Sequence, residues 1–323
     1  MDGTLRLAVS GSQRASVPPL RRTALVIGCV IVATTSAACG EGPNRTPAPA
    51  DLVGLVVLTD DGGRSRLTTF DAAGQARSQT GPAGPIAWIS AGRRGTLIAT
   101  MADGSLRLSD RVRTDHDAAW KRVPSARVDI PAEPIYFATW APSGNRFAGL
   151  AADFGQDASP SLVVVDPLAD SSLILPVPGQ ALPEPPAWLD ESRVLLETRA
   201  GTVILGVDGA DTTAGPDLGN GAALIDVSAD GLHVAIGPTQ PGPVTIRSRD
   251  AWLTGAGQPE ASLGNGTVGA VALDHGAERL AVIWQQQSAA GIVVVYRRAG
   301  GWHESSRLPL PSGSQRGVLT WLP

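Results

Sequence analysis

The sequence predicts an all-β fold, and three observations support this. Short runs rich in Val, Ile and Leu alternate with clusters of Gly, Pro, Asp and Ser, a pattern typical of strands joined by tight turns. A similar unit recurs after residue 50, with spacings of 39 to 52 residues. No segment in this part shows the apolar periodicity of a helix of any length. We therefore expect a repeated β-structure from residue 51 to residue 323.

Each repeat starts with an aromatic or small apolar anchor, continues with a turn residue four positions later, and ends in an apolar strand. The clearest copy is Trp140-Ala-Pro-Ser-Gly144, which FAGLA follows. The six anchors are Trp88, Trp140, Trp188, Val227, Ala272 and Trp321. A further apolar strand is expected later in five of the repeats, at 105–108, 162–165, 203–207, 244–246 and 292–296. We expect the anchor Trp residues, and also Trp120, Trp252 and Trp302, to serve in packing.

A period of about 40 to 50 residues with four short strands is the signature of a propeller blade, because one four-stranded sheet cannot bury both of its faces. The repeat resembles the WSPDG-type blade of TolB-like and WD40-like propellers. This resemblance implies that Trp140 lies on an innermost strand and Gly144 in the turn to the second strand. The architecture is also similar to the propeller portion of LpqB, an actinobacterial lipoprotein, and this likeness implies a function through protein contacts.

The two ends of the repeat region complement each other. The chain stops just after an innermost strand has begun, at Trp321, whereas residues 52–71 read as a second strand followed by a third. We therefore expect the C-terminal strand to pair with the N-terminal strands. This pairing predicts a six-bladed β-propeller, closed into a ring and without an exposed inner edge.

The N-terminus reads as an export signal. Arg21 and Arg22 precede an apolar run at 23–35, and Ser36-Ala37-Ala38-Cys39 follows. The last four residues resemble a bacterial lipobox, with Ser36 where Leu is usual, and this implies lipidation of Cys39. Ordinary cleavage after residue 38, which would release a soluble protein, is the alternative. We expect a signal at 1–38, a disordered tether at 39–50, and a location at the outer face of the cytoplasmic membrane, held by the lipid alone.

Composition excludes several kinds of site. The net charge is −4 and the basic residues are scattered, which argues against nucleic acid. Cys29 and Cys39 are the only cysteines, so the folded part has no thiol chemistry. The four His fall in four different repeats, and we expect His275 to be a solvated turn residue. Asp-Gly turns such as 60–63 and 208–211 could hold calcium, but tight turns demand the same residues. We expect no metal and no cofactor.

Binding is the function that these features favour. In the predicted fold, the loops from the second to the third strand gather on one face, where binding residues usually concentrate. We select Asp60, Asp61, Phe154, Asp157, Gln285, Gln286 and Gln287 as candidate contact residues. The leading hypothesis is a lipid-anchored scaffold that binds another cell-envelope protein. The alternative is a propeller enzyme, similar to a lactonase or a glycosidase. Three or more Asp, Glu, Asn or His side chains that converge in the channel would favour this alternative. No catalytic residue can be named from the sequence.

Overall fold

The computed structural model describes residues 49–323, except 62–63, 113–116, 124–133, 152–159, 210, 219–222, 287–290 and 311–316. Cys39, the signal at 1–38 and most of the tether lie outside this part. Its secondary structure comprises 23 strands and two helices of four and five residues, α1 (Pro49–Leu52) and α2 (Arg249–Leu253). The expectation of an all-β chain is confirmed.

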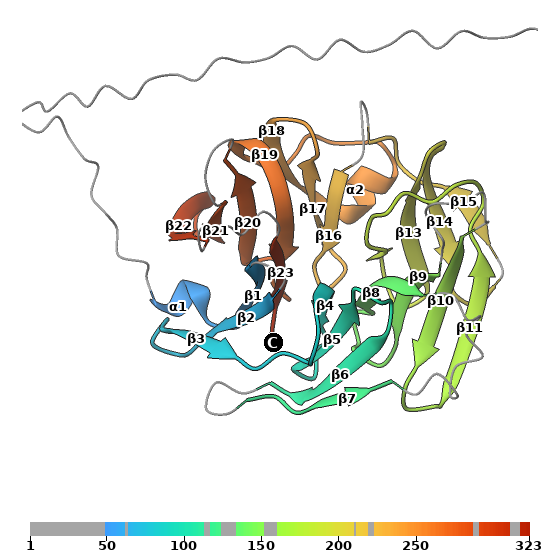
Figure 1. Cartoon of the computed structure of the whole chain (residues 1–323). Helices are drawn as coiled ribbons and strands as arrows, with labels where there is room; N and C mark the ends of the chain where they lie inside the picture. Colours follow the sequence, from blue (N-terminus) through green and yellow to red (C-terminus); the bar gives the residue numbers. More distant parts are fainter. Residues whose placement is uncertain are drawn as a thin grey trace, which may run out of the picture. The chain divides into compact units, whose positions relative to one another are not determined.

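The strands form five antiparallel sheets in the described part (Figure 1). The first sheet has the order β23 (Gly317–Trp321), β1 (Leu55–Asp61), β2 (Arg64–Phe70) and β3 (Ala76–Gln79). The second contains β4 (Ile86–Ala91), β5 (Thr96–Met101), β6 (Leu106–Arg111) and β7 (Trp120–Arg122). The third contains β8 (Ile135–Trp140), β9 (Phe147–Ala151), β10 (Ser161–Asp166) and β11 (Ser171–Pro176). The fourth contains β12 (Ala187–Trp188), β13 (Arg193–Thr198), β14 (Gly201–Gly206) and β15 (Thr212–Ala214).

The fifth sheet has seven strands because one long strand serves two units. It contains β16 (Ala223–Val227), β17 (His233–Pro238), β18 (Gly242–Ser248), β19 (Ala261–Leu273), β20 (Arg279–Gln285), β21 (Ile292–Arg298) and β22 (Trp302–Pro309). The first half of β19, up to Gly266, pairs with β18, and the second half, from Thr267, pairs with β20. The sheet therefore consists of two four-stranded units, β16 to β19 and β19 to β22.

The apolar strand residues pack between neighbouring units. Six hydrophobic clusters occur in the described part, and each joins side chains from two adjacent four-stranded units. In one of them, Leu150 and Leu162 of β9 and β10 pack with Val194 and Leu196 of β13. Each fully buried side chain of this size stabilises the fold by about 1.5–3 kcal/mol. Neighbouring units thus cover the faces that a single sheet leaves open.

The first strands of the units lie side by side. Contacts run from β23 to β4, from β4 to β8, from β8 to β12, from β12 to β16, from β16 to β19, and from β19 back to β23. Figure 1 shows β23, β4, β8 and β16 towards the middle of the domain and β3, β7, β11, β15 and β22 at its periphery. The last strand of each unit is therefore an outer strand.

The two ends of the described chain meet in the first sheet. β23 pairs antiparallel with β1, with Leu319 opposite Val57. Trp321 is 3% exposed, and its indole Nε1 donates a hydrogen bond of 2.9 Å to the Ala272 carbonyl. The Arg279 guanidinium lies 4.3 Å from the centre of the Trp321 ring and donates to the Val53 carbonyl at 2.7 Å. The pairing expected from the sequence at Trp321 is present.

The repeat register was predicted correctly for Trp140 but wrongly for Trp88. As expected, Trp140 ends β8 and Gly144, with φ 69°, lies in the turn to β9. The Gly144 amide donates to the Ala141 carbonyl, and in the preceding unit the equivalent bond joins Gly95 to Gly92. Gly95 is thus the counterpart of Gly144, and Trp88 lies three residues before the counterpart of Trp140. Both strands have an irregularity in their pairing, between Ile86 and Trp88 in β4 and between Tyr136 and Thr139 in β8.

Candidate functional site

A central channel is lined by residues of β4, β8, β12, β16, β19 and β23 and by residues beside them. Its wall includes Ser90, Thr139, Asp226 and Thr320, with Arg93 and His275 from the adjoining turns, among mainly apolar residues. The cavity volume is about 130 Å³. Little open space therefore remains between the strands.

Polar side chains of the wall bond to the backbone of the next inner strand. Each of these bonds spans two units, so the side chains hold neighbouring units together. The hydroxyl oxygens of Thr320 and Ser90 accept hydrogen bonds from the Ala91 amide at 3.0 Å and the Trp140 amide at 3.1 Å, respectively. The Thr139 hydroxyl donates to the Pro186 carbonyl at 2.8 Å. The Asp226 carboxyl accepts from the Leu273 amide at 2.6 Å. The channel wall is thereby a set of links between units.

Tryptophans contribute to the same links. The Trp188 indole donates to the Thr139 carbonyl at 3.0 Å, as the Trp321 indole does to Ala272. Trp88 packs edge-on against the Phe137 ring, with 6.0 Å between ring centres. Trp120, Trp252 and Trp302 belong to or pack against the hydrophobic clusters. The expected packing role of these residues is confirmed.

Asp226 is the carboxyl group of the channel wall. Its side chain is partly accessible to solvent in the channel. Burial raises the pKa of Asp226 to about 7, and hydrogen bonds from the Leu273 and Val227 amides oppose this rise. The carboxyl group is therefore partly protonated at neutral pH.

A second carboxyl group, that of Glu197, bonds to the start of β16, the strand that carries Asp226 near its end. Glu197 of β13 is 8% exposed and accepts hydrogen bonds from the Ala223 amide, the first residue of β16, at 3.2 and 3.3 Å. Burial raises the pKa of Glu197 to about 7, and repulsion from Glu184 adds to the rise. Burial also raises the pKa of Glu184. Buried carboxyl groups thus bond to the backbone on both sides of β16.

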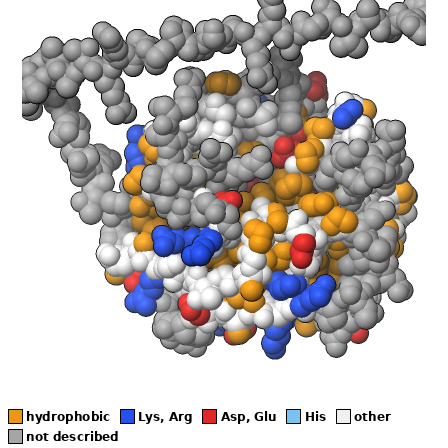
Figure 2. Space-filling view, in the orientation of Figure 1, with side chains coloured by type: hydrophobic (Ala, Val, Ile, Leu, Met, Phe, Trp, Pro, Cys, Tyr) orange, Lys and Arg blue, Asp and Glu red, His pale blue; other side chains and the backbone are white. Residues whose placement is uncertain are grey.

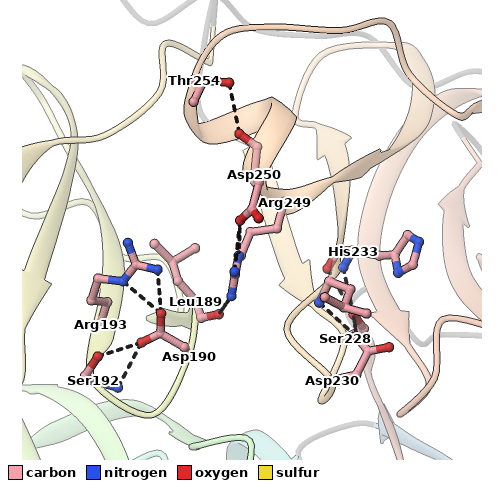
Figure 3. A network of polar contacts seen from close by, with 11 residues as sticks. Leu189, Asp190, Ser192, Arg193, Ser228, Asp230, His233, Arg249, Asp250 and Thr254 are labelled. Carbon is pink, nitrogen blue, oxygen red and sulfur yellow. Dashed lines mark hydrogen bonds and ion pairs between the residues drawn. The ribbon is translucent and has the colours of Figure 1, made fainter.

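The side of the domain where each first strand turns into the second is rich in links between units (Figure 3). Arg249, at the start of α2, donates to the Leu189 carbonyl at 2.9 Å and pairs with the Asp250 carboxylate at 2.9 Å. In the neighbouring turn, the Asp190 carboxylate bonds to Arg193 and to the Ser192 amide. We call this the turn side, defined by residues 92–95, 141–146, 189–192, 228–232 and 274–278.

The turn side carries further links of this kind. The Ser143 hydroxyl donates to the Glu191 carboxylate at 2.8 Å, and Arg94 donates to the Asn145 side-chain oxygen at 3.0 Å. Many polar groups here are thus bonded to a neighbouring unit. The opposite side, which we call the loop side, carries the connections from second to third strands and those between units. Because second strands run towards the loop side, their last residues lie there.

Part of the predicted contact set lies on the loop side. Asp60 is exposed one residue before the end of β1, which is the second strand of its unit. Gln285 is exposed at the end of β20, another second strand, and Gln286 is exposed directly after it. Asp61 ends β1 and pairs in register with Arg64. Phe154, Asp157 and Gln287 lie outside the described residues. Their role as contact residues, like that of Asp60, Gln285 and Gln286, stays a prediction.

Sequence reasoning missed both Asp226 and Glu197. Each is a single carboxylate inside an apolar strand, in the runs LID and VLLE, and this isolation was the available signal. His275 was expected to be solvated, but it is half-buried and adjoins the channel, where burial, followed by repulsion from Arg93, lowers its pKa. A propeller enzyme was expected to have three or more Asp, Glu, Asn or His side chains converging in the channel. Among the described residues, Asp226 and His275 are the two side chains of these types that line the channel.

The described residues show neither a metal-binding cluster nor a membrane-spanning helix. They contain no group of three or more His, Cys, Asp or Glu side chains placed to hold a metal ion. No helix among them is both long and apolar enough to cross a bilayer.

Comparison with known proteins identifies the kind of fold. No protein-family model matches the sequence, and no curated protein matches it either. Among solved structures, TolB from Acinetobacter baumannii superimposes with a TM-score of 0.62 at 12% identity, over 83% of this chain and 67% of that one. The β-propeller domain of Cps50 (Swd1) from Myceliophteria thermophila gives a TM-score of 0.49 at 15% identity, over 86% and 88% of the two chains.

The fold is therefore a β-propeller. More particularly, it is similar to TolB, as the Trp140-Ala-Pro-Ser-Gly144 motif led us to expect. At 12% identity this likeness concerns the arrangement of the chain and does not extend to the partners of TolB.

Proposed function

We propose that residues 51–323 form a six-bladed propeller, closed by β23 in the blade of β1, that acts as a binding scaffold for another protein of the cell envelope. The six four-stranded units, the circular series of contacts between their first strands, and the β23–β1 pairing support the six-bladed ring. The partner binds on the loop side.

The size of the channel is the observation that carries this proposal. Sites for small molecules usually have volumes of about 300–1,000 Å³. The channel offers about 130 Å³, and its polar groups are engaged in bonds between blades. Recognition therefore falls to the outer surface. There, loops held on a rigid scaffold can contact a macromolecule.

The loop side suits a partner better than the turn side does. On the turn side, Arg249, Glu191 and Arg94 are committed to neighbouring blades or turns. On the loop side, the exposed Asp60, Gln285 and Gln286 end or follow the second strands of two adjacent blades. A partner could contact these residues with little disturbance of the bonds that hold the ring.

A comparison of purified complexes tests the binding function. The protein is purified from cross-linked membranes with its N-terminus intact, as the parent chain and as a Gln285→Arg, Gln286→Arg variant. The matched control is Leu232→Arg, because Leu232 is 58% exposed and lies on the turn side. We expect one envelope protein to be lost with the Gln variant and kept with the control. Equal recovery in all three samples would contradict binding at the loop side.

The anchor is a separate part of the proposal. The apolar run at 23–35 and the Ser36-Ala37-Ala38-Cys39 site support export and attachment of lipid to Cys39, which places the propeller outside the cytoplasmic membrane. The variant Cys39→Ala should move the protein from the membrane fraction to the soluble exported fraction. Unchanged fractionation would rule out anchoring through Cys39.

A further inference from the structure

The outer strand of the third blade differs from the other outer strands. In the described part, four large hydrophobic side chains are exposed, and three of them lie on β11 and the turn before it: Leu168 at 68%, Leu173 at 38% and Ile174 at 37%. Large exposed apolar side chains that cluster in this way mark contact surfaces. β11 is also the last strand of its sheet, so its outer backbone edge has no partner strand among the described residues.

Other outer strands have features that discourage pairing with a further strand. Arg77 lies on β3, Lys121 and Arg122 lie on β7, and β22 carries both Glu304 and Arg307. β15 has three residues, and the outer half of β19 contains two glycines. Charges and short length are the usual protection of edge strands. β11, with the sequence SSLILP, is six residues long and has no charged side chain.

The backbone of β11 offers two donors outwards. Val177, directly after the strand, donates to the Pro160 carbonyl at the near end of β10. Backbone groups alternate in direction along a strand, so Leu175 and Leu173 also point towards β10. The amides and carbonyls of Ser172 and Ile174 therefore point away from the sheet.

We propose that two copies of this chain associate through β11, in antiparallel pairing about a two-fold axis that passes between the two Leu173 residues. In this register Ser172 of one copy lies opposite Ile174 of the other. Both outward amides of each copy then donate to the second copy, which gives four hydrogen bonds. The two third blades become one continuous eight-stranded sheet.

The sequence of β11 favours a second copy in this register. A shift towards the C-terminus places Pro176, which has no amide hydrogen, opposite Ser172. A shift towards the N-terminus brings in Asp170, which is outside the strand and has φ 54°. In the proposed register Asp170 faces Pro176 of the other copy, so no two carboxylates are opposed. The same surface on both copies is thus complementary to itself, as a two-fold interface requires.

Sedimentation velocity of the full chain at rising concentration tests the association. We expect a monomer–dimer equilibrium. Leu173→Lys sets two positive charges opposite each other and should abolish the dimer. Leu232→Lys is the control, because Leu232 is 58% exposed on the turn side, and it should leave the dimer unchanged. A parent chain that stays monomeric at every concentration, or a dimer that survives Leu173→Lys, would overturn the proposal.

A disulfide test fixes the register and does not depend on the strength of association. Both variants are made in the full chain with Cys29→Ser and Cys39→Ser. Directly opposed residues have Cβ atoms about 4.5–5.5 Å apart, within reach of a disulfide, so Leu173→Cys should give a covalent dimer on oxidation. Two Ser172→Cys residues would be offset by two positions and should not be linked. Equal cross-linking of both variants would exclude this register.

Discussion

Removing the charge of Asp226 should change how stability depends on pH. The pKa of this carboxyl is about 7 in the folded protein, against an ordinary value of 3.8. Between about pH 4 and pH 7 the folded state therefore binds more protons than the unfolded state, and the free energy of unfolding falls as the pH rises. In Asp226→Asn, the amide oxygen can still accept the bond from the Leu273 amide, but the group no longer ionises. The variant should lose this part of the pH dependence.

The size of the effect follows from the pKa. A difference of one pKa unit corresponds to 1.36 kcal/mol, so the raised pKa of Asp226 represents at most roughly 4 kcal/mol above pH 7. Channel access to water and the weaker hydrogen bond of a neutral acceptor reduce this figure. We expect Asp226→Asn to be more stable than the parent chain by roughly 2 kcal/mol at pH 8, and about equally stable at pH 4.

Urea unfolding, followed by tryptophan fluorescence from pH 4 to pH 8, measures this difference. Asp60→Asn is the control, because it removes a carboxylate from an exposed position on β1. The control should follow the pH dependence of the parent chain. If the curves of Asp226→Asn and the parent chain stay parallel over the whole range, burial does not disfavour the charge of Asp226 and the reasoning is wrong.

Three further predictions concern the packing of the blades. Deleting 318–323 removes the partner of β1 and should abolish cooperative thermal unfolding, and a cooperative transition in the truncated chain would contradict closure by β23. Gly104→Ala should cost about 3 kcal/mol in urea unfolding, because Gly104 has φ 74° and a Cβ there would lie 2.1 Å from the Pro134 Cβ; a loss below about 1 kcal/mol would contradict this. Trp321→Phe should cost about 2 kcal/mol, because it removes the hydrogen bond from the indole to the Ala272 carbonyl and weakens the contact with the Arg279 guanidinium; unchanged stability would show that these two contacts contribute nothing.

The sequence allowed the repeated β-structure to be predicted because repeats leave a periodic pattern. Trp140 and Gly144 were placed correctly since their spacing matches a turn that requires a positive φ at Gly144. The same spacing misled at Trp88 and Gly92, because Trp88 lies three residues earlier in its strand than Trp140 does, and Gly95 occupies the position in the turn that Gly144 has. The hydrophobic pattern does not show how far along the strand an aromatic residue lies.

The contacts across the channel could not be predicted from the sequence. The bond from the Leu273 amide to Asp226 joins residues 47 positions apart, and it exists because two blades place their first strands side by side. Nothing in the strand ALIDV distinguishes such a carboxyl from a solvated one, apart from its apolar neighbours. The exposed ends of β1 and β20 were easier to predict, because every second strand ends on the same side of the fold.

The exposed positions of Gln285 and Gln286 make the binding test interpretable. Links between blades occur in the channel and on the turn side, where Ser90, Arg249 and Trp321 bond across neighbouring blades. On the loop side, Ser65 and Glu197 accept bonds from the first residues of β4 and β16. Gln285 is exposed at the end of β20, where its backbone pairs in register with Thr267 of the same blade. Substitutions at exposed surface positions usually change stability by less than about 0.5 kcal/mol. Loss of a partner from the Gln285→Arg, Gln286→Arg variant would therefore report on contact at the loop side, with the fold intact.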